Sequence, residues 1–170
     1  MTVRIQHINE SDPPYFIDLL GGVFEHSPWV AEQAFLLSPF SSRENLHESM
    51  VNIVRKAPAE QQLELLCRHP ELAGKEAASG HLTRASRNEQ ASAGLDQCSA
   101  AELARLDACN RDYRARFGFP FIIAVTGLDK AAILAAMERR LQHSREDEFK
   151  TAMDEVEKIA WIRICTLING

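Results

Sequence analysis

Residues 144–167 read SREDEFKTAMDEVEKIAWIRICTL, and this stretch predicts the last helix of the chain. Its apolar residues recur mostly three and four positions apart, which is the spacing of one helical face. Ser144 is a suitable N-cap for this helix. A helix with one apolar face buries that face against other elements, so the stretch favours a helical bundle. The residues of the apolar face are Phe149, Ala152, Met153, Val156, Ile159, Ala160 and Leu167.

The segments before this helix are also predicted to be helical, with one exception. SAAE at 99–102 forms a capping box that opens a long helix ending at Gly118. A further helix is expected over 129–143. Between them, FPFIIAVTG at 119–127 is continuously apolar, but Pro120 argues against a central strand. We therefore expect a short extended segment that is buried between helices.

Four more helices are expected in the N-terminal part of the chain. One is capped by Ser11 and begins at Pro13-Pro14, one opens at Ser27-Pro28, one is capped by Ser41 or Ser42, and one runs from about Pro58 to Arg68. Residues 71–98 are rich in Gly, Ala and Ser, and we expect an elaborated loop there with a short helix from Arg87. The predicted fold is all-α, a single domain over residues 1–170 with about eight helices.

Composition restricts the classes of function. The 170 residues are 45% hydrophobic and carry a formal net charge of −5, which is typical of a globular protein and argues against electrostatic binding of nucleic acid. No apolar run approaches the roughly 20 residues of a membrane span. The N-terminus lacks the apolar core of a secretory signal and the C-terminus lacks a peroxisomal tripeptide, so we expect a cytoplasmic protein.

The cysteines and histidines show no spacing typical of metal ligands. None of Cys67, Cys98, Cys109 and Cys165 forms a C-x-x-C pair, so we expect free thiols that behave as small buried hydrophobic residues. The histidines also lack pairwise ligand spacing, and no metal site is expected.

Two polar residues fall on apolar helical faces. Arg163 lies in phase with the apolar face of the last helix, where an unpaired charge would be costly. The first expectation is that it pairs with a carboxylate or with helix-end carbonyls; the alternative is a clamp for an anion or an amide. Asn110 lies on the apolar face of the helix that ends at Gly118, and we expect it to bind neighbouring backbone.

His69 is the candidate for proton transfer. It lies with Pro70 where a helix must end, at the start of the predicted loop, and imidazole titrates near neutral pH. A histidine at a helix end is more often structural. Downstream, SRNEQ at 86–90 resembles a capping box in which Glu89 binds back to Ser86, and local statistics favour this interpretation. The alternative places Glu89 and Gln90 beside His69.

Five blocks of the sequence, taken together, carry a family resemblance. Their order and spacing resemble the 2-oxo-4-hydroxy-4-carboxy-5-ureidoimidazoline (OHCU) decarboxylases of the uric acid pathway, over nearly the whole chain. The blocks are VFEHSPW (23–29), HPELAGK (69–75), SRNEQASAGLD (86–96), NRDYRARFGFPFIIAV (110–125) and KIAWIRI (158–164).

The resemblance implies an all-helical homodimer that needs no metal or organic cofactor and yields (S)-allantoin from a ureidoimidazoline substrate. It implies that His69 is the proton donor, that Glu89 is its acidic catalytic partner and that Arg163 is the catalytic arginine of the last helix. Residues 71–98 then contain an active-site loop. The substrate-binding residues that it implies are Pro70, Ser86, Arg87, Asn88, Glu89, Gln90, Phe121, Ile122, Ile123, Ala124 and Val125.

Two alternatives stay open at this point. One is a helical binding module in which His69, Glu89 and Arg163 are all structural. The other is a decarboxylase or hydrolase that acts on a related ureido-ring compound. A site that joins these residues around a cavity would favour an enzyme, and only a substrate screen separates the two enzymes.

Overall fold

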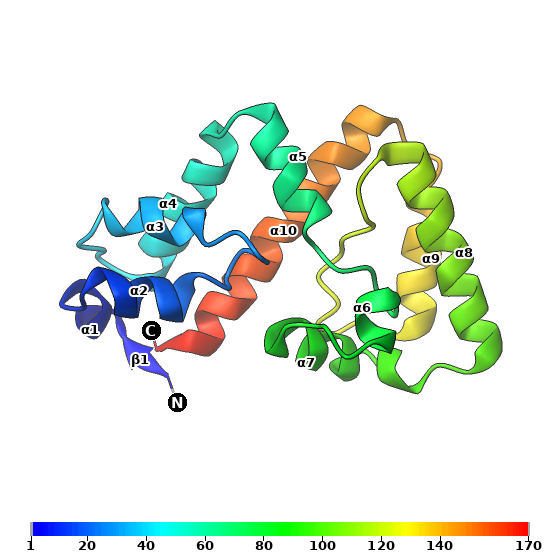
Figure 1. Cartoon of the computed structure of the whole chain (residues 1–170), viewed down its shortest axis with the longest axis horizontal. Helices are drawn as coiled ribbons and strands as arrows, with labels where there is room; N and C mark the ends of the chain where they lie inside the picture. Colours follow the sequence, from blue (N-terminus) through cyan, green and yellow to red (C-terminus); the bar gives the residue numbers. More distant parts are fainter. Residues whose placement is uncertain (1, 170) are drawn as a thin grey trace. The chain divides into compact units, whose positions relative to one another are not determined.

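The computed structural model describes residues 2–169, and its regular structure is almost entirely helical (Figure 1). These residues form ten α-helices, one 3-10 helix (η1) and one pair of two-residue strands, so the all-α prediction is confirmed. The helices beyond the expected number are short. The bounds are β1 (Val3–Arg4), α1 (Ile5–Asn9), α2 (Pro13–Leu20), α3 (Trp29–Phe35), α4 (Arg43–Lys56), α5 (Ala59–Cys67), α6 (Lys75–Ala78), α7 (Arg84–Ser92), η1 (Leu95–Gln97), α8 (Ala100–Phe117), α9 (Lys130–Arg140), α10 (Arg145–Leu167) and β2 (Ile168–Asn169).

The chain divides into two compact units. The first contains the residues up to Arg68 and those from Glu157 onward, and the second contains His69–Val156. Helix α10 therefore contributes its first half to the second unit and its second half to the first. Among the described residues, no helix is both long enough and apolar enough to cross a membrane.

The first unit is built on α2, α3 and α4. Helix α3 packs against both of the others, and the buried side chains between them are apolar. Strand β1, near the N-terminus, pairs in parallel with β2, near the C-terminus, and so links the two segments of the chain that make up this unit. The predicted cap Ser42 is confirmed, because its side chain accepts from the Asn45 N–H. The cap of α2 is Asp12 rather than Ser11: Asp12 Oδ1 accepts from Tyr15 N at 3.0 Å.

The second unit packs α8 against α9, which lie side by side in Figure 1. The predicted capping box of Ser99 and Glu102 opens α8, and Gly118 ends it with a φ of 83°, a left-handed conformation that glycine adopts without strain. The apolar segment at 119–127 contains no strand, as expected, and most of it is buried. Ser144 caps α10, since its Oγ accepts from the Asp147 N–H at 3.1 Å.

Residues 71–98 are more helical than predicted, since they contain α6, α7 and η1. The predicted start at Arg87 is wrong, because α7 begins at Arg84 and its N-cap is Thr83, whose side chain accepts from the Ser86 N–H at 3.2 Å. The capping box of Ser86 and Glu89 is therefore also wrong. Ser86 lies inside the helix, one turn after the true cap.

The prediction of uniformly buried cysteines is also wrong. Cys109 is buried, Cys98 and Cys165 are partly exposed, and Cys67 at the end of α5 is exposed. Burial raises the pKa of the Cys98 and Cys109 thiols, which lowers their thiolate fraction at neutral pH.

Candidate active site

His69 follows Arg68, the C-cap of α5, and is the first residue of the second unit. Pro70 disfavours the helical conformation for the residue before it, so the chain leaves α5 here. The His69 side chain is only 7% exposed, and both ring nitrogens are shielded from solvent. The structure thus places a titratable imidazole in an enclosed position, where a proton can be held away from bulk water.

The loop after His69 is held by side chains from two helices. Gln90 on α7 accepts at Oε1 from the Ala73 N–H at 2.9 Å, and Asn110 on α8 donates from Nδ2 to the Leu72 carbonyl at 2.9 Å. Arg114, one turn further along α8, donates from Nε to Glu71 Oε1 at 2.9 Å. The prediction that Asn110 binds neighbouring backbone is confirmed. Three successive residues are therefore anchored, which limits the movement of the histidine before them.

One residue of this loop and one of its anchors have energetically unfavourable features. Ala73 adopts a φ of 50°, in the left-handed region that costs an L-residue about 1–2 kcal/mol. The Oδ1 atom of Asn110 is shielded from solvent and has no hydrogen-bond partner among the described residues. Buried polar groups are normally paired, so both features indicate that packing imposes the loop conformation.

Burial divides the 86–90 block into two groups. Ser86 and Gln90 lie one helical turn apart on α7 and are 4% and 5% exposed. Glu89 is half-buried, whereas Arg87 and Asn88 are exposed. Arg87 donates from Nη2 to the Leu82 carbonyl at 3.3 Å, which ties α7 to the chain before it. The structure therefore joins Gln90 to the histidine loop and turns two of the predicted substrate-binding side chains toward solvent.

The predicted substrate-binding segment 121–125 begins in an aromatic cluster. The Tyr113 ring on α8 packs edge-on against Phe119 and Phe121, with centroids 5.9 and 5.4 Å apart. Two backbone groups of the segment are bound by side chains: Arg140 donates from Nη1 to the Ile122 carbonyl at 2.8 Å, and Glu155 accepts from the Ala124 N–H at 2.8 Å. The segment is thus fixed although it forms no regular structure.

A buried polar cluster behind this segment was missed by sequence reasoning. Arg140 on α9 donates from Nε to Oε2 of Glu148 on α10 at 2.9 Å, and the two side chains are 4% and 0% exposed. Tyr113 donates its hydroxyl to the same carboxylate, and His143 Nδ1 lies 2.9 Å from Oε1. Burial and the hydrogen bond to Glu148 raise the pKa of the Tyr113 hydroxyl, so it remains a donor. Glu148 lies on the same face of α10 as Ala152 and Ile159, and this helical phase could have predicted its burial from the sequence.

Arg163 belongs to the first unit and is 5% exposed. Its Nη1 donates to Glu25 Oε2 at 2.5 Å and to the Gly22 carbonyl at 3.0 Å. Glu25 is 1% exposed, so the two opposite charges are buried together. The expected pairing with a carboxylate and a carbonyl is confirmed.

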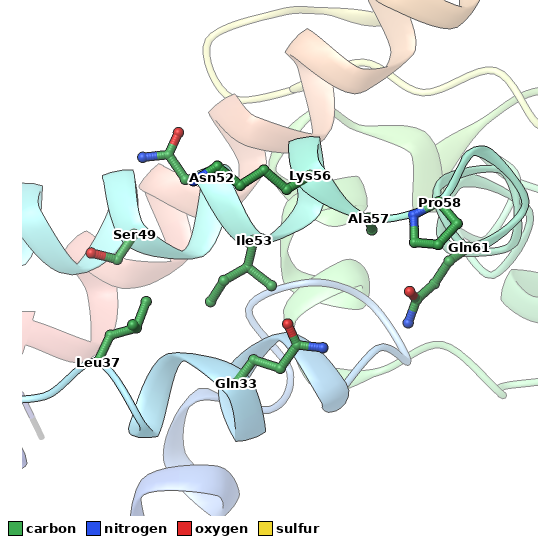
Figure 2. A pocket seen from close by; sticks show the side chains of 9 residues that line it. All are labelled: Gln33, Leu37, Ser49, Asn52, Ile53, Lys56, Ala57, Pro58 and Gln61. Atoms are coloured by element: carbon green, nitrogen blue, oxygen red, sulfur yellow. The ribbon is translucent and has the colours of Figure 1, made fainter.

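A cavity of about 460 Å³ lies in the first unit between α3 and the end of α4 (Figure 2). None of the predicted site residues lines it. Its polar groups come from amide side chains, the Ser49 hydroxyl and the Lys56 ammonium. The described residues that line it include neither a carboxylate nor an imidazole, the groups that general acid–base catalysis uses most often. The candidate active site is placed at His69 because its imidazole is enclosed and the loop that follows it is anchored by Gln90 and Asn110.

Comparison with known proteins identifies the family. Residues 9–165 match the family model described as OHCU decarboxylase. The chain belongs to this family. The match includes every residue of the candidate site, and family membership makes the chain a decarboxylase rather than a binding module without activity.

Individual relatives agree with the family model. The chain is 46% identical to a 2-oxo-4-hydroxy-4-carboxy-5-ureidoimidazoline decarboxylase of Haloferax volcanii, over 95% of this chain and 94% of the relative. It is 41% identical to the uric acid degradation bifunctional protein PucL of Bacillus subtilis, again over 95% of this chain but over 32% of that longer protein. The crystal structure of an (S)-allantoin synthase matches 98% of this chain and 54% of its own, with a TM-score of 0.79 and 34% identity.

Proposed function

We propose that this chain decarboxylates 2-oxo-4-hydroxy-4-carboxy-5-ureidoimidazoline to (S)-allantoin in urate degradation, with His69 as the proton donor. The observation that carries the proposal is the enclosed imidazole of His69 at the head of a loop that Gln90 and Asn110 anchor. Family membership and the activity by which the matched relatives are named support the choice of substrate.

The chemistry gives His69 a definite task. Decarboxylation breaks the bond between the ring carbon and the carboxyl group and leaves the electron pair on that carbon. The resemblance implies no cofactor, so the ring and its carbonyl groups accept the charge. A proton must then reach the same carbon. A fixed imidazolium that approaches one face delivers it to that face, which accounts for a single enantiomer.

Glu89 and Gln90 are proposed to act beside His69 in different ways. Glu89 is the acidic partner that orients the imidazole or the substrate hydroxyl. Gln90 is buried and already binds the Ala73 N–H, which favours a role in holding the histidine loop. Ser86 lies on the same buried face of α7, so it remains a candidate for direct contact with substrate.

Segment 121–125 is proposed to contribute both apolar surface and backbone groups. Its anchored groups are the carbonyl of Ile122 and the N–H of Ala124. In an extended backbone, alternate residues direct their N–H and C=O groups to opposite sides. We propose that the N–H and C=O of Ile123, which lies between these two anchored residues, bind the donor and acceptor groups of a ureide.

Arg163 is proposed to orient the substrate or to stabilise charge that develops on the ring. Binding the carboxylate that leaves would stabilise the ground state and would not lower the barrier by itself. Its Nη1 is engaged by Glu25 and Gly22, which fixes the direction of the guanidinium. A pre-oriented cation loses little freedom when an anionic ring binds.

The test is direct assay of the purified chain. Fresh substrate is generated from urate by urate oxidase and hydroxyisourate hydrolase, and the circular dichroism of (S)-allantoin is followed. We expect acceleration by the chain and a fall of about 10²–10⁴-fold in kcat for His69→Asn. His81→Asn, an exposed histidine of the same unit, is the control and keeps full activity. No acceleration by the wild-type chain contradicts the proposal.

We further propose that the active form is a cytoplasmic homodimer, which the family resemblance supports. Light scattering after size exclusion tests the assembly: the expected mass is twice the 19.1 kDa of the chain. A mass of one chain at micromolar concentration contradicts the dimer.

A further inference from the structure

The polar cluster of Arg140, Glu148 and Tyr113 is not explained by stability alone. Arg140 and Glu148 are almost completely buried, and their charges are 2.9 Å apart. Replacing a buried ion pair by uncharged residues of similar size often leaves stability unchanged or improves it, because both charges lose their hydration on burial. Burial of this pair behind segment 121–125 therefore points to a role in addition to stability.

The guanidinium of Arg140 contacts a carboxylate, a backbone carbonyl and an aromatic ring at the same time. Its Nε faces the Glu148 carboxylate, while its Nη1 donates to the Ile122 carbonyl at 2.8 Å. Its central carbon also lies 4.4 Å from the centre of the Phe121 ring. One planar fork therefore fixes the backbone of one residue and the ring of the residue before it, which a lysine ammonium at this position would not do.

We propose that Arg140, oriented by Glu148, is a positioning residue that sets the register of segment 121–125 for the substrate. This inference rests on the proposed function, in which that segment contacts the ring. Arg140 acts through Ile122 and touches no substrate. The carboxylate of Glu148 is held in turn by the Tyr113 hydroxyl and lies beside His143, so the arginine is fixed from several sides.

A double variant separates positioning from folding. Arg140→Met with Glu148→Gln removes both charges, keeps the volumes, and leaves an amide that accepts from the Tyr113 hydroxyl. We expect it to fold, to show faster hydrogen exchange at the amides of residues 121–125, and to lose roughly 100-fold in kcat/KM, mainly through KM, since small displacements of binding groups have effects of this size. Arg140→Lys alone keeps the positive charge but removes the planar fork, and we expect it to lose less kcat/KM than the double variant but more than none.

The matched control removes a surface pair between α8 and α9, the helix that also carries Arg140. Arg105 donates to Glu138, and both side chains are about half exposed. Arg105→Met with Glu138→Gln is expected to leave kcat/KM and the exchange of residues 121–125 unchanged. If the Arg140/Glu148 double variant folds with unchanged exchange and unchanged KM, the positioning role is wrong. If the wild-type chain forms no (S)-allantoin, the proposed function fails, and the exchange measurement alone decides the positioning role.

Discussion

Arg163 donates from Nη1 to Oε2 of Glu25 over 2.5 Å, and both side chains are almost completely excluded from solvent. The arginine proposed to act on the substrate is therefore also half of a buried ion pair. Simple removal of Arg163 leaves the Glu25 charge uncompensated, so loss of activity and loss of structure would occur together. Variants that keep the fold stable are therefore needed to separate the catalytic role of Arg163 from its structural role.

The first prediction concerns this pair. Arg163→Ala is expected to destabilise the fold by about 3–5 kcal/mol, because it leaves a buried carboxylate without its partner. Arg163→Met with Glu25→Gln removes both charges and is expected to recover most of that stability. Denaturant unfolding measures both variants. If Arg163 acts on the substrate, the stable double variant remains inactive; a stable and fully active double variant would restrict Arg163 to a structural role.

The second prediction concerns the anchor of the histidine loop. Gln90→Met removes the acceptor of the Ala73 N–H at a site that is 5% exposed. Leaving this partly buried donor unpaired is expected to cost about 1 kcal/mol and to lower kcat as His69 becomes less well placed. Gln97→Met on η1 makes the same chemical change at an exposed site and is the control. Equal thermal stability of the two variants would argue against the anchor.

The third prediction uses the backbone of Ala73. Its φ of 50° is costly for alanine but not for glycine, so Ala73→Gly is expected to stabilise the fold by about 0.5–1 kcal/mol after the greater chain entropy of glycine is subtracted. Ala77→Gly inside α6 is the comparison and should destabilise by about 1 kcal/mol. Thermal unfolding measures both changes. A lower Tm for Ala73→Gly would show that the backbone of Ala73 is not strained.

The fourth prediction concerns the cysteines. Cys67 is exposed, whereas burial raises the pKa of the Cys98 and Cys109 thiols. A short pulse of iodoacetamide is expected to label Cys67 before these two, as read by mass spectrometry. Cys67→Ser should retain full decarboxylase activity, because Cys67 is exposed whereas the proposed proton donor His69 is buried and acts without a thiol. Loss of activity in Cys67→Ser would implicate the thiol in the reaction.

Local signals predicted the helices well where only one cap was available. The capping box of Ser99 and Glu102 begins α8 and Gly118 ends it, as predicted. At α7 the chain offers two caps three residues apart, Thr83 and Ser86, and only the first is used. Both residues offer a hydroxyl group that can cap the first turn. We infer that the position at which α7 begins is decided by the burial of Gln90 against the loop at residues 71–73. That contact is tertiary and leaves no local pattern.

Helical phase places two charged residues, Arg163 and Glu148, on the apolar face of α10, but only the burial of Arg163 was predicted. It placed Arg163 on the apolar face of α10 and predicted its pairing correctly. The same test places Glu148 on that face, yet this residue follows Arg145, Glu146 and Asp147 in a charged run that is typical of an exposed first turn. Its partner Arg140 lies on another helix, so no spacing along the chain links the two.

The anchors of the histidine loop have a consequence for the order of folding. Gln90 and Asn110 reach the loop across 17 and 38 residues of chain. Such contacts form only after the intervening chain has closed, which is slower than the formation of a single helix. The loop conformation, including the unfavourable φ of Ala73, is therefore expected to form late, when α7 and α8 dock. In a refolding experiment, recovery of catalysis should lag behind recovery of helical circular dichroism, so enzymatic activity would be the most demanding reporter of a completed native state.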